Sequence, residues 1–182
     1  MILLRYGNTN NFLISCLNGY LLLDTDYAGT LQAFYRSVKQ AGIRVSDISF
    51  VMATHYHPDH MGLIPELMMQ KVKLLLIDTQ KDFVHFSDSI FARDRLPFEP
   101  IDETKATVKN CADSREFLAG IGIRGEIIST PSHSPDSITL VLDDGDCFVG
   151  DLQPREYMDE ENEDWTRVMG FQPKRIFYAH AN

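Results

Sequence analysis

The chain has 182 residues, 44% of them hydrophobic, and its 17 basic and 26 acidic side chains give a formal net charge of -9. This length and composition predict one globular domain over residues 1–182. The acidic balance argues against a nucleic-acid partner, and neither a signal peptide nor an apolar run of the roughly 20 residues that span a bilayer is evident. We therefore expect a cytoplasmic protein with no membrane contact.

The three cysteines, Cys16, Cys111 and Cys147, are far apart in the sequence and form no C-x-x-C pair. This spacing is typical neither of a disulfide framework nor of a thiolate zinc site. We expect all three to be reduced structural residues.

The first third of the chain predicts an antiparallel meander with a turn at Asn18-Gly19, its strands covering residues 1–5, 11–16 and 20–24. Apolar residues then recur at helical spacing from Leu31 to Val38, which predicts a helix that ends at Gly42. A strand at 48–54, a short helix at 64–69 and a strand at 72–77 come next. This alternation indicates a sheet that is covered by helices.

Between Asp78 and Lys109 the apolar periodicity is lost and two prolines interrupt the segment, so we expect a helix followed by an irregular loop. The phenylalanines at 83, 86, 91 and 98 are open to three interpretations: a substrate lid, packing of a helix on the sheet, or a dimer contact. The second half predicts strands at 126–130, 137–142 and 147–150, a helix at 161–169 and a final strand at 175–179. The acidic run 159–164 is interpreted as the solvated start of that helix, where negative charge suits the helix dipole.

An H-Y-H-P-D-H run at residues 55–60 follows the strand predicted at 48–54. Side chains two apart on an extended segment point the same way, so His55 and His57 can bind one cation together. The proline then turns the chain, which can direct Asp59 and His60 to a second cation about 4 Å from the first. The spacing therefore suits two cations, and Tyr56 is expected to point away into the core.

Three further candidates lie at the ends of later predicted strands: His133, Asp151 and His180. His133 is in the inter-strand loop T-P-S-H-S-P-D-S, and the Asp151 carboxylate ends a strand from which it could bridge two metals. His85 lies in a helical, aromatic segment without a matching motif, so we interpret it as a surface or packed histidine outside the site.

In these four separated elements, taken in order, the chain resembles the metallo-β-lactamase superfamily of hydrolases. That family carries an H-x-H-x-D-H run, a later histidine in a T-P-G-H-like loop, an aspartate in a Gly-Asp pair and a final histidine after the last strand. The resemblance covers nearly the whole chain. It implies an α+β fold, a four-layer αββα sandwich of two mixed sheets flanked by helices, with the site at one edge.

The resemblance also implies a role for each candidate residue. The ligands of the first metal are then His55, His57 and His133. The ligands of the second metal are Asp59, His60 and His180. Asp151 bridges the two metals, and Asp24 supports a ligand from behind.

Two departures from the family pattern bear on the substrate side. Ser132 and Asp136 stand where the family has glycines, which alters the loop around His133. The stretch from Asp151 to His180 is short, so we expect a substrate side that is open or is completed by a second copy of the chain in a homo-oligomer. Near the end of the sequence, His180 is also expected to fray and to weaken the second metal site.

Together these features predict a metal-dependent hydrolase in which two divalent cations bind a hydroxide that attacks a small ester, thioester or related small molecule, as in the glyoxalase II-like branch that the motif set resembles. Asp59 is the expected catalytic residue, because it would bind a metal and orient the hydroxide. Nitrogen and carboxylate ligands favour zinc, with iron or manganese as alternatives. Three other functions stay open: a phosphodiesterase or nuclease on the same metals, a β-lactamase, and a metal-binding scaffold without catalysis.

Overall fold

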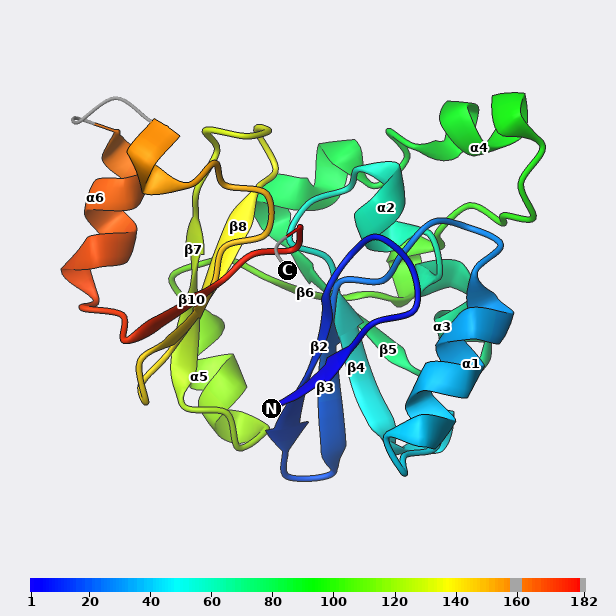
Figure 1. The fold of residues 1–182 in the computed structure, drawn as a ribbon, viewed down its shortest axis with the longest axis horizontal. Coiled ribbons are helices and arrows are strands. Elements are labelled where there is room, and N and C mark those ends of the chain that lie inside the picture. Colours follow the sequence, from blue (N-terminus) through cyan, green and yellow to red (C-terminus); the bar gives the residue numbers. More distant parts are fainter. Residues whose placement is uncertain (158–161, 181–182) are drawn as a thin grey trace.

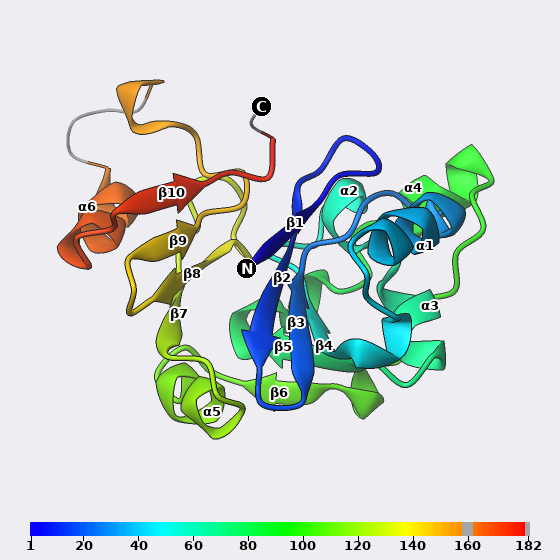
Figure 2. The ribbon, with the colours of Figure 1, turned by 60° about the horizontal axis from the view of Figure 1, so that its bottom comes forward.

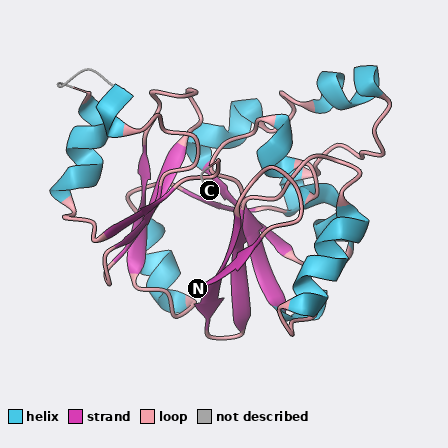
Figure 3. Cartoon of the chain, in the orientation of Figure 1, coloured by secondary structure: helices cyan, strands magenta, loops and turns pink. Residues whose placement is uncertain are grey.

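The chain folds into two β-sheets that face each other, with helices on the outer side of each sheet (Figure 1, Figure 2). The computed structural model describes residues 1–157 and 162–180. Figure 3 shows the strands of both sheets between the two outer groups of helices. This arrangement confirms the four-layer α+β sandwich that the sequence predicts.

The first sheet has six strands in chain order, and its first two pairings are antiparallel while the next three are parallel. Its strands are β1 (Ile2–Leu4), β2 (Asn11–Cys16), β3 (Gly19–Leu23), β4 (Ile48–Met52), β5 (Lys73–Ile77) and β6 (Thr107–Lys109). The crossover helices α1 (Leu31–Gln40) and α3 (Ile64–Met69) cover its outer face, at the right of Figure 1. Two further helices, α2 (Pro58–Met61) and α4 (Asp88–Asp94), lie above them.

The second sheet has four strands in the order β10-β9-β8-β7, and only the β9–β10 pair is parallel. Its strands are β7 (Gly125–Ser129), β8 (Ile138–Leu142), β9 (Asp146–Phe148) and β10 (Arg175–Phe177). Helix α6 (Glu163–Gly170) covers its outer face, and α5 (Ser114–Gly120) packs at its lower end (Figure 1). Short 3-10 helices cover Val45–Asp47, Asp78–Phe83, Glu103–Lys105 and Arg155–Tyr157.

Neighbouring side chains of one strand enter different parts of the core. In β3, Leu22 packs toward α1 and α3, whereas Leu21 and Leu23 face the second sheet. In β9, Phe148 faces the first sheet, whereas Cys147 packs toward α6. Because sheets in the middle of a sandwich are covered on both faces, their strands are near-continuous apolar runs in the sequence.

The predicted and observed elements differ mainly at strand ends and in three short elements. The strand predicted at 48–54 ends at Met52, because the backbone N–H of Thr54 bonds to the Asp24 carboxylate instead of to a neighbouring strand. The sequence pattern does not reveal α2, α5 or β6. An α2 of 4 residues and a β6 of 3 residues are too short to show a period, and β6 is defined by its pairing with β5.

The Phe-rich segment divides into packed and exposed rings. Phe91 is fully buried and its ring centroid lies 4.4 Å from that of Phe98, so these two rings pack a helix onto the fold. Phe86 is instead 56% exposed, and its ring centroid lies 5.7 Å from that of His57. The packing interpretation therefore holds for part of the segment, while Phe86 lies beside the candidate site.

Two further predictions concern the cysteines and the membrane. All three cysteines are free, and Cys147 is buried, which agrees with a structural role for it. Within residues 1–157 and 162–180, every helix lacks the length and apolar character that crossing a bilayer requires.

Candidate metal centre

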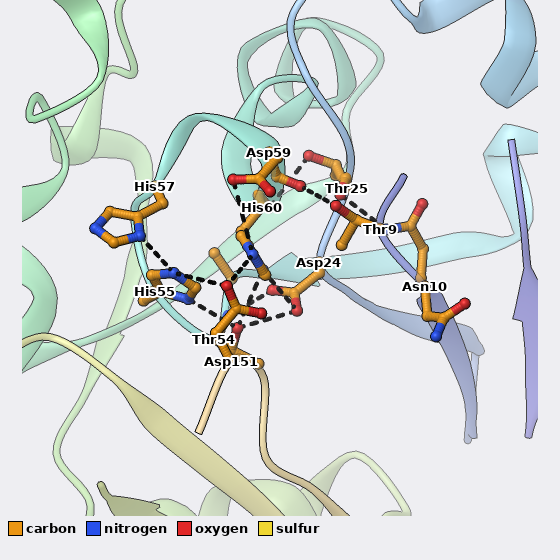
Figure 4. A network of polar contacts seen from close by, with 12 residues as sticks. Thr9, Asn10, Asp24, Thr25, Thr54, His55, His57, Asp59, His60 and Asp151 are labelled. Carbon is orange, nitrogen blue, oxygen red and sulfur yellow. Dashed lines mark hydrogen bonds and ion pairs between the residues drawn. The ribbon is translucent and has the colours of Figure 1, made fainter. Parts of the chain in front are cut away.

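Four separate segments bring the seven candidate ligands together at one edge of the sandwich. Figure 4 shows His55, His57, Asp59, His60 and Asp151 among them. The 55–60 run follows β4 and enters α2, and the loop between β7 and β8 contributes His133. Asp151 and His180 follow β9 and β10, which are neighbouring parallel strands of the second sheet. The site therefore joins residues from both sheets.

Three histidines form the first group of potential ligands. His57 ends the extended segment before α2, with φ -71° and ψ 154°, and the proline after it starts the helix. The Nδ1 atom of His57 lies 2.9 Å from Nε2 of His55 and 3.2 Å from Nε2 of His133. Nitrogen lone pairs that converge in this way are typical of a site that holds one cation among three imidazoles.

A second group forms around α2, and Asp151 lies between the two groups. The Nε2 atom of His180 is 3.1 Å from Oδ2 of Asp59, and both are near His60. Asp151 Oδ2 is 3.3 Å from Nε2 of His60 and 3.7 Å from Nε2 of His133. One carboxylate thus contacts histidines of both groups, which is the position that a bridging ligand requires.

Burial and neighbouring charges give the site histidines different protonation behaviour. Burial lowers the pKa of His55, and the surrounding imidazoles lower it further, so this side chain stays neutral and able to bind a metal. Burial also lowers the pKa of His60, but Asp24 and Asp151 outweigh it and raise that pKa to about 10. The pocket around His60 therefore stabilises a positive charge between two carboxylates.

The donor set fits two metal ions. Three groups of potential ligands have their ligand atoms within 4.8 Å of one another: His55, His57 and His133; His55, His60 and Asp151; Asp59, His60 and His180. Nε2 of His60 and Oδ1 of Asp151 are buried and accept or donate no hydrogen bond among the described residues. Since buried polar atoms are nearly always satisfied, two unpartnered atoms at the meeting point of the groups indicate cation binding.

Comparison of the sequence with family models gives independent information on this site. The family model for the metallo-beta-lactamase superfamily matches residues 4–180. The chain belongs to this superfamily. The resemblance that the sequence motifs predict is therefore confirmed.

Relatives of this metallo-β-lactamase superfamily chain agree in fold. A beta-lactamase-like protein 2 homolog from Drosophila melanogaster is 25% identical over 182 residues, which is 96% of this chain but 59% of that relative. TTHA1623, solved in a di-iron-bound form, superposes with a TM-score of 0.70 at 19% identity, covering 100% of this chain and 91% of that one. A Cronobacter sakazakii metallo-β-lactamase gives 0.65 at 20% identity, covering 94% and 74%. At these identities the solved structures establish the fold alone.

Asp24 lies behind the candidate metal centre and next to His60, where the resemblance places it. Its Oδ2 atom lies 3.2 Å from Nδ1 of His60 and accepts a hydrogen bond from the Thr54 hydroxyl at 3.0 Å (Figure 4). Asp24 has a left-handed backbone with φ 60°. Gly150 packs so closely that a Cβ there would lie 2.6 Å from the Thr54 hydroxyl oxygen. The backbone before His55 and the backbone before Asp151 are therefore in close contact, through Thr54 and Gly150.

The loop over residues 7–10 ties His180 to the rest of the site. The Asp26 carboxylate accepts backbone hydrogen bonds from Asn8 at 2.7 Å and from Thr9 at 3.2 Å. The carbonyl of Asn8 then lies 3.1 Å from Nδ1 of His180, and Ala179 pairs by its backbone with Gly150 and Asn10. Three backbone groups therefore hold the described part of this segment, and the fraying of His180 stays a prediction.

Asp136 and Gln80 organise the His133 loop, and the sequence does not reveal these roles. The Asp136 carboxylate accepts a hydrogen bond of 2.7 Å from the backbone N–H of Tyr56. The buried Gln80 amide donates to the carbonyls of Ala53, Thr54 and Asp136. In the sequence, the one sign of these roles is Asp136, which stands where the family has a glycine. Gln80 belongs to no motif.

Ser132, the other departure from the family pattern, connects the His133 loop to α6. Its backbone N–H donates to Asp164 at 2.6 Å, and its hydroxyl accepts from Asn162 at 3.0 Å. Asp164 is only 2% exposed, so the interpretation of a solvated acidic helix start is wrong at this residue. Residues 159–161 of the acidic run lie outside the described residues.

Two aromatic side chains near the site have the positions that the sequence predicts. Tyr56 is 1% exposed and packs in the core under α1 and α3. His85 is exposed and lies away from the ligands, 2.9 Å from Asp88 and 3.1 Å from Glu103. Neither therefore belongs to the metal centre.

Two hollows adjoin the ligands from different sides. A groove of about 640 Å³ contains His133, Asp151 and His180 in its lining. A recess of about 80 Å³ lies against His57 and Phe86. A molecule that reaches the metal centre can therefore extend in two directions.

Proposed function

We propose that this chain is a hydrolase that uses two divalent cations to activate water against a small ester or thioester. The supporting observation is the convergence of seven ligand residues, in three overlapping groups, in a chain of this superfamily. His55, His57 and His133 would hold the first cation; Asp59, His60 and His180 would hold the second; Asp151 would join both. When bound, such a pair lowers the pKa of a shared water from about 15.7 toward about 7, which supplies a nucleophile at neutral pH.

The chain's own residues would position and orient the reactants. His55 and His60 are 1% and 0% exposed, so the inner face of the centre is closed to solvent. The side chain of Asp59 is 24% exposed and lies on the open face. Its carboxylate can therefore accept a hydrogen bond from the attacking water and set its orientation, which is the catalytic role proposed for it.

The metal identity is proposed from the donor set. The three ligand groups contain imidazole and carboxylate and no thiolate, which favours zinc, with iron or manganese as alternatives. The di-iron-bound form of TTHA1623 makes iron the first alternative to test. Elemental analysis after reconstitution with each metal should give two equivalents per chain, whereas one equivalent would contradict a dinuclear site.

The proposed substrate is a small molecule. A groove of about 640 Å³ beside the ligands can hold one, and a net charge of -9 disfavours polyanions. Metal-reconstituted protein should hydrolyse at least one member of a panel of esters, thioesters and lactones. Cleavage of phosphodiesters alone would favour a phosphodiesterase instead, cleavage of β-lactams alone a β-lactamase, and full metal occupancy without any hydrolysis a scaffold.

The variant His57→Ala tests whether hydrolysis depends on the centre. Its Nδ1 atom faces two other imidazoles, so its loss should release the first metal and lower kcat/KM about a thousandfold or more. The control is His85→Ala, because His85 is also a histidine with charged partners but lies outside the ligand groups. Full hydrolysis by His57→Ala with one metal missing would refute the mechanism.

A further inference from the structure

The side chains described in the groove beside the candidate metal centre include two carboxylates and no lysine or arginine. Nine described residues line it, and they include the metal-site residues His133, Asp151 and His180. The remainder are Gly150, Leu152, Gln153, Pro154, Glu156 and Tyr178. None of these nine is a lysine or arginine, and Arg155, next to Glu156 in sequence, is not among them.

Glu156 is the one carboxylate in the described lining of this groove that lies outside the ligand groups. Among the residues that the structure describes, it forms no ion pair and no hydrogen bond with another side chain. Glu156 and Tyr178 both line the groove. The lining therefore combines an aromatic ring with a carboxylate that has no ion-pair partner among the described residues.

The recess on the other side of the ligands has a different character. It has a volume of about 80 Å³, and its lining includes Phe83, Phe86 and Pro135 around His57. Since a water molecule occupies about 30 Å³ in the liquid, this space suits a group no larger than a short alkyl chain. The larger and more polar part of a substrate must then lie in the groove.

We propose that the groove is a leaving-group subsite that selects a positively charged amine or quaternary ammonium through Glu156 and Tyr178, while the recess takes a short acyl chain. This inference rests on the proposed function. A cation there is attracted by the carboxylate, and the phenol ring can add a cation–π contact. A leaving group that carries a carboxylate would instead be repelled by Glu156, and apart from the cations of the metal centre the described lining has no lysine or arginine to offset that repulsion.

Three thioacetates of similar size test this selectivity. Acetylthiocholine carries a quaternary ammonium, 3,3-dimethylbutyl thioacetate is its neutral isostere, and 3-(acetylthio)propionate is anionic. On metal-loaded protein, kcat/KM should be about fivefold higher for the cation than for the isostere, and lowest for the anion. Equal values for all three, or a preference for the anion, would overturn the proposal.

Variants at the subsite show whether Glu156 is responsible. In Glu156→Gln the cation-to-isostere ratio of kcat/KM should fall to about one, and in Glu156→Lys the anion should become the better substrate of the charged pair. Glu116→Gln is the matched control, because it removes the same charge from an exposed position on α5. A ratio that falls equally in this control would assign the preference to net charge and would overturn the subsite.

A binding measurement separates this inference from the proposed function. S-methylthiocholine is a thioether analogue that cannot be hydrolysed, and its affinity can be measured by calorimetry with and without metals. Its Kd should rise about fivefold in Glu156→Gln and stay unchanged in Glu116→Gln. If no thioester is hydrolysed but this pattern holds, the proposed substrate fails and the cation subsite stands. A Kd that does not depend on Glu156 overturns the subsite whatever the activity.

Discussion

Residues that contact the candidate ligands from the buried side hold much of this site in place. Asp24 accepts hydrogen bonds from both the backbone and the hydroxyl of Thr54, and it also faces Nδ1 of His60. It does so with φ 60°, a conformation that costs a residue with a side chain about 1–3 kcal/mol. A strained residue that contacts a candidate ligand points to a role in orienting that ligand.

Asp24→Asn should weaken the second metal site. Asparagine tolerates the left-handed backbone but loses the charge that faces His60, and the loss of such an outer partner lowers metal affinity by about 10- to 100-fold. Titration with a competing chelator measures the two affinities separately. Asp47→Asn is the control, because Asp47 is an acidic residue whose partner is Arg44 far from the ligands. An unchanged second-site affinity in Asp24→Asn would show that Asp24 has no such role.

At the scale of elements, loops hold the ligands where strands have ended. The 7–10 loop has no regular structure, yet its backbone joins the Asp26 carboxylate, and Thr9 donates its hydroxyl to the Asp59 carbonyl at 2.8 Å. Gly7 is required there, because a Cβ would lie 1.8 Å from the Asp26 carboxylate. The loop thereby positions ligands of the second group.

Gly7→Ala should therefore move this loop. We expect a loss of about 1–3 kcal/mol in the free energy of unfolding, together with weaker binding of the second metal. Gly170→Ala is the matched control, because a Cβ at Gly170 meets nothing within 4 Å. Denaturant unfolding and metal titration measure both effects. Equal behaviour of the two variants would contradict the proposed role of the loop.

The contacts of the exposed His85 predict that the free energy of unfolding depends on pH. Its contact with Asp88 raises its pKa and Glu103 raises it further, which more than offsets the effect of burial. A pKa raised above the unfolded value of about 6.5 means that the stabilisation is full below that pH and is lost as pH rises through the folded pKa. His85→Gln should thus lower the free energy of unfolding at pH 5.5, by less than about 1 kcal/mol because the pair is exposed, and leave it unchanged at pH 9. The opposite pH order would contradict this assignment.

At the scale of the whole molecule, the candidate metal centre draws its residues from both sheets. Residues 55–60 follow β4 of the first sheet, whereas Asp151 and His180 follow strands of the second. A ligand that binds only the folded state stabilises it by about 2.7 kcal/mol at 100 times its Kd. Removal of metal with a chelator should therefore lower Tm by about 5–10 °C.

Thermal unfolding with and without chelator measures that shift. His57→Ala provides the comparison, because it lacks a ligand of the first group and should show a smaller chelator effect. A Tm that the chelator leaves unchanged in the unmodified chain would contradict a structural link through metals. The single domain over 1–182, the cytoplasmic location and the homo-oligomer stay predictions at this scale.

The sequence was sufficient for most of the strands and longer helices, although not for α2, α5 or β6, and for the candidate ligands. Alternation and helical spacing predict strands such as β2 and helices such as α3, because burial of both sheet faces produces visible apolar runs. The H-x-H-x-D-H run can be recognised in the sequence because its candidate ligands are close neighbours. Their spacing alone brings the side chains together.

Contacts between distant segments could be decided only by the tertiary structure. The amide of Gln80 reaches Asp136, and Ser132 reaches Asp164, through packing that no local pattern encodes. The same holds for the pairing that defines β6, and for the groove that Glu156 and Tyr178 both line. The sequence by itself determined the family, the fold class and the candidate ligands, because these are readable from local patterns and short motifs. Which side chains contact those candidates from behind, and which charge lines the groove beside them, depended on how the two sheets pack.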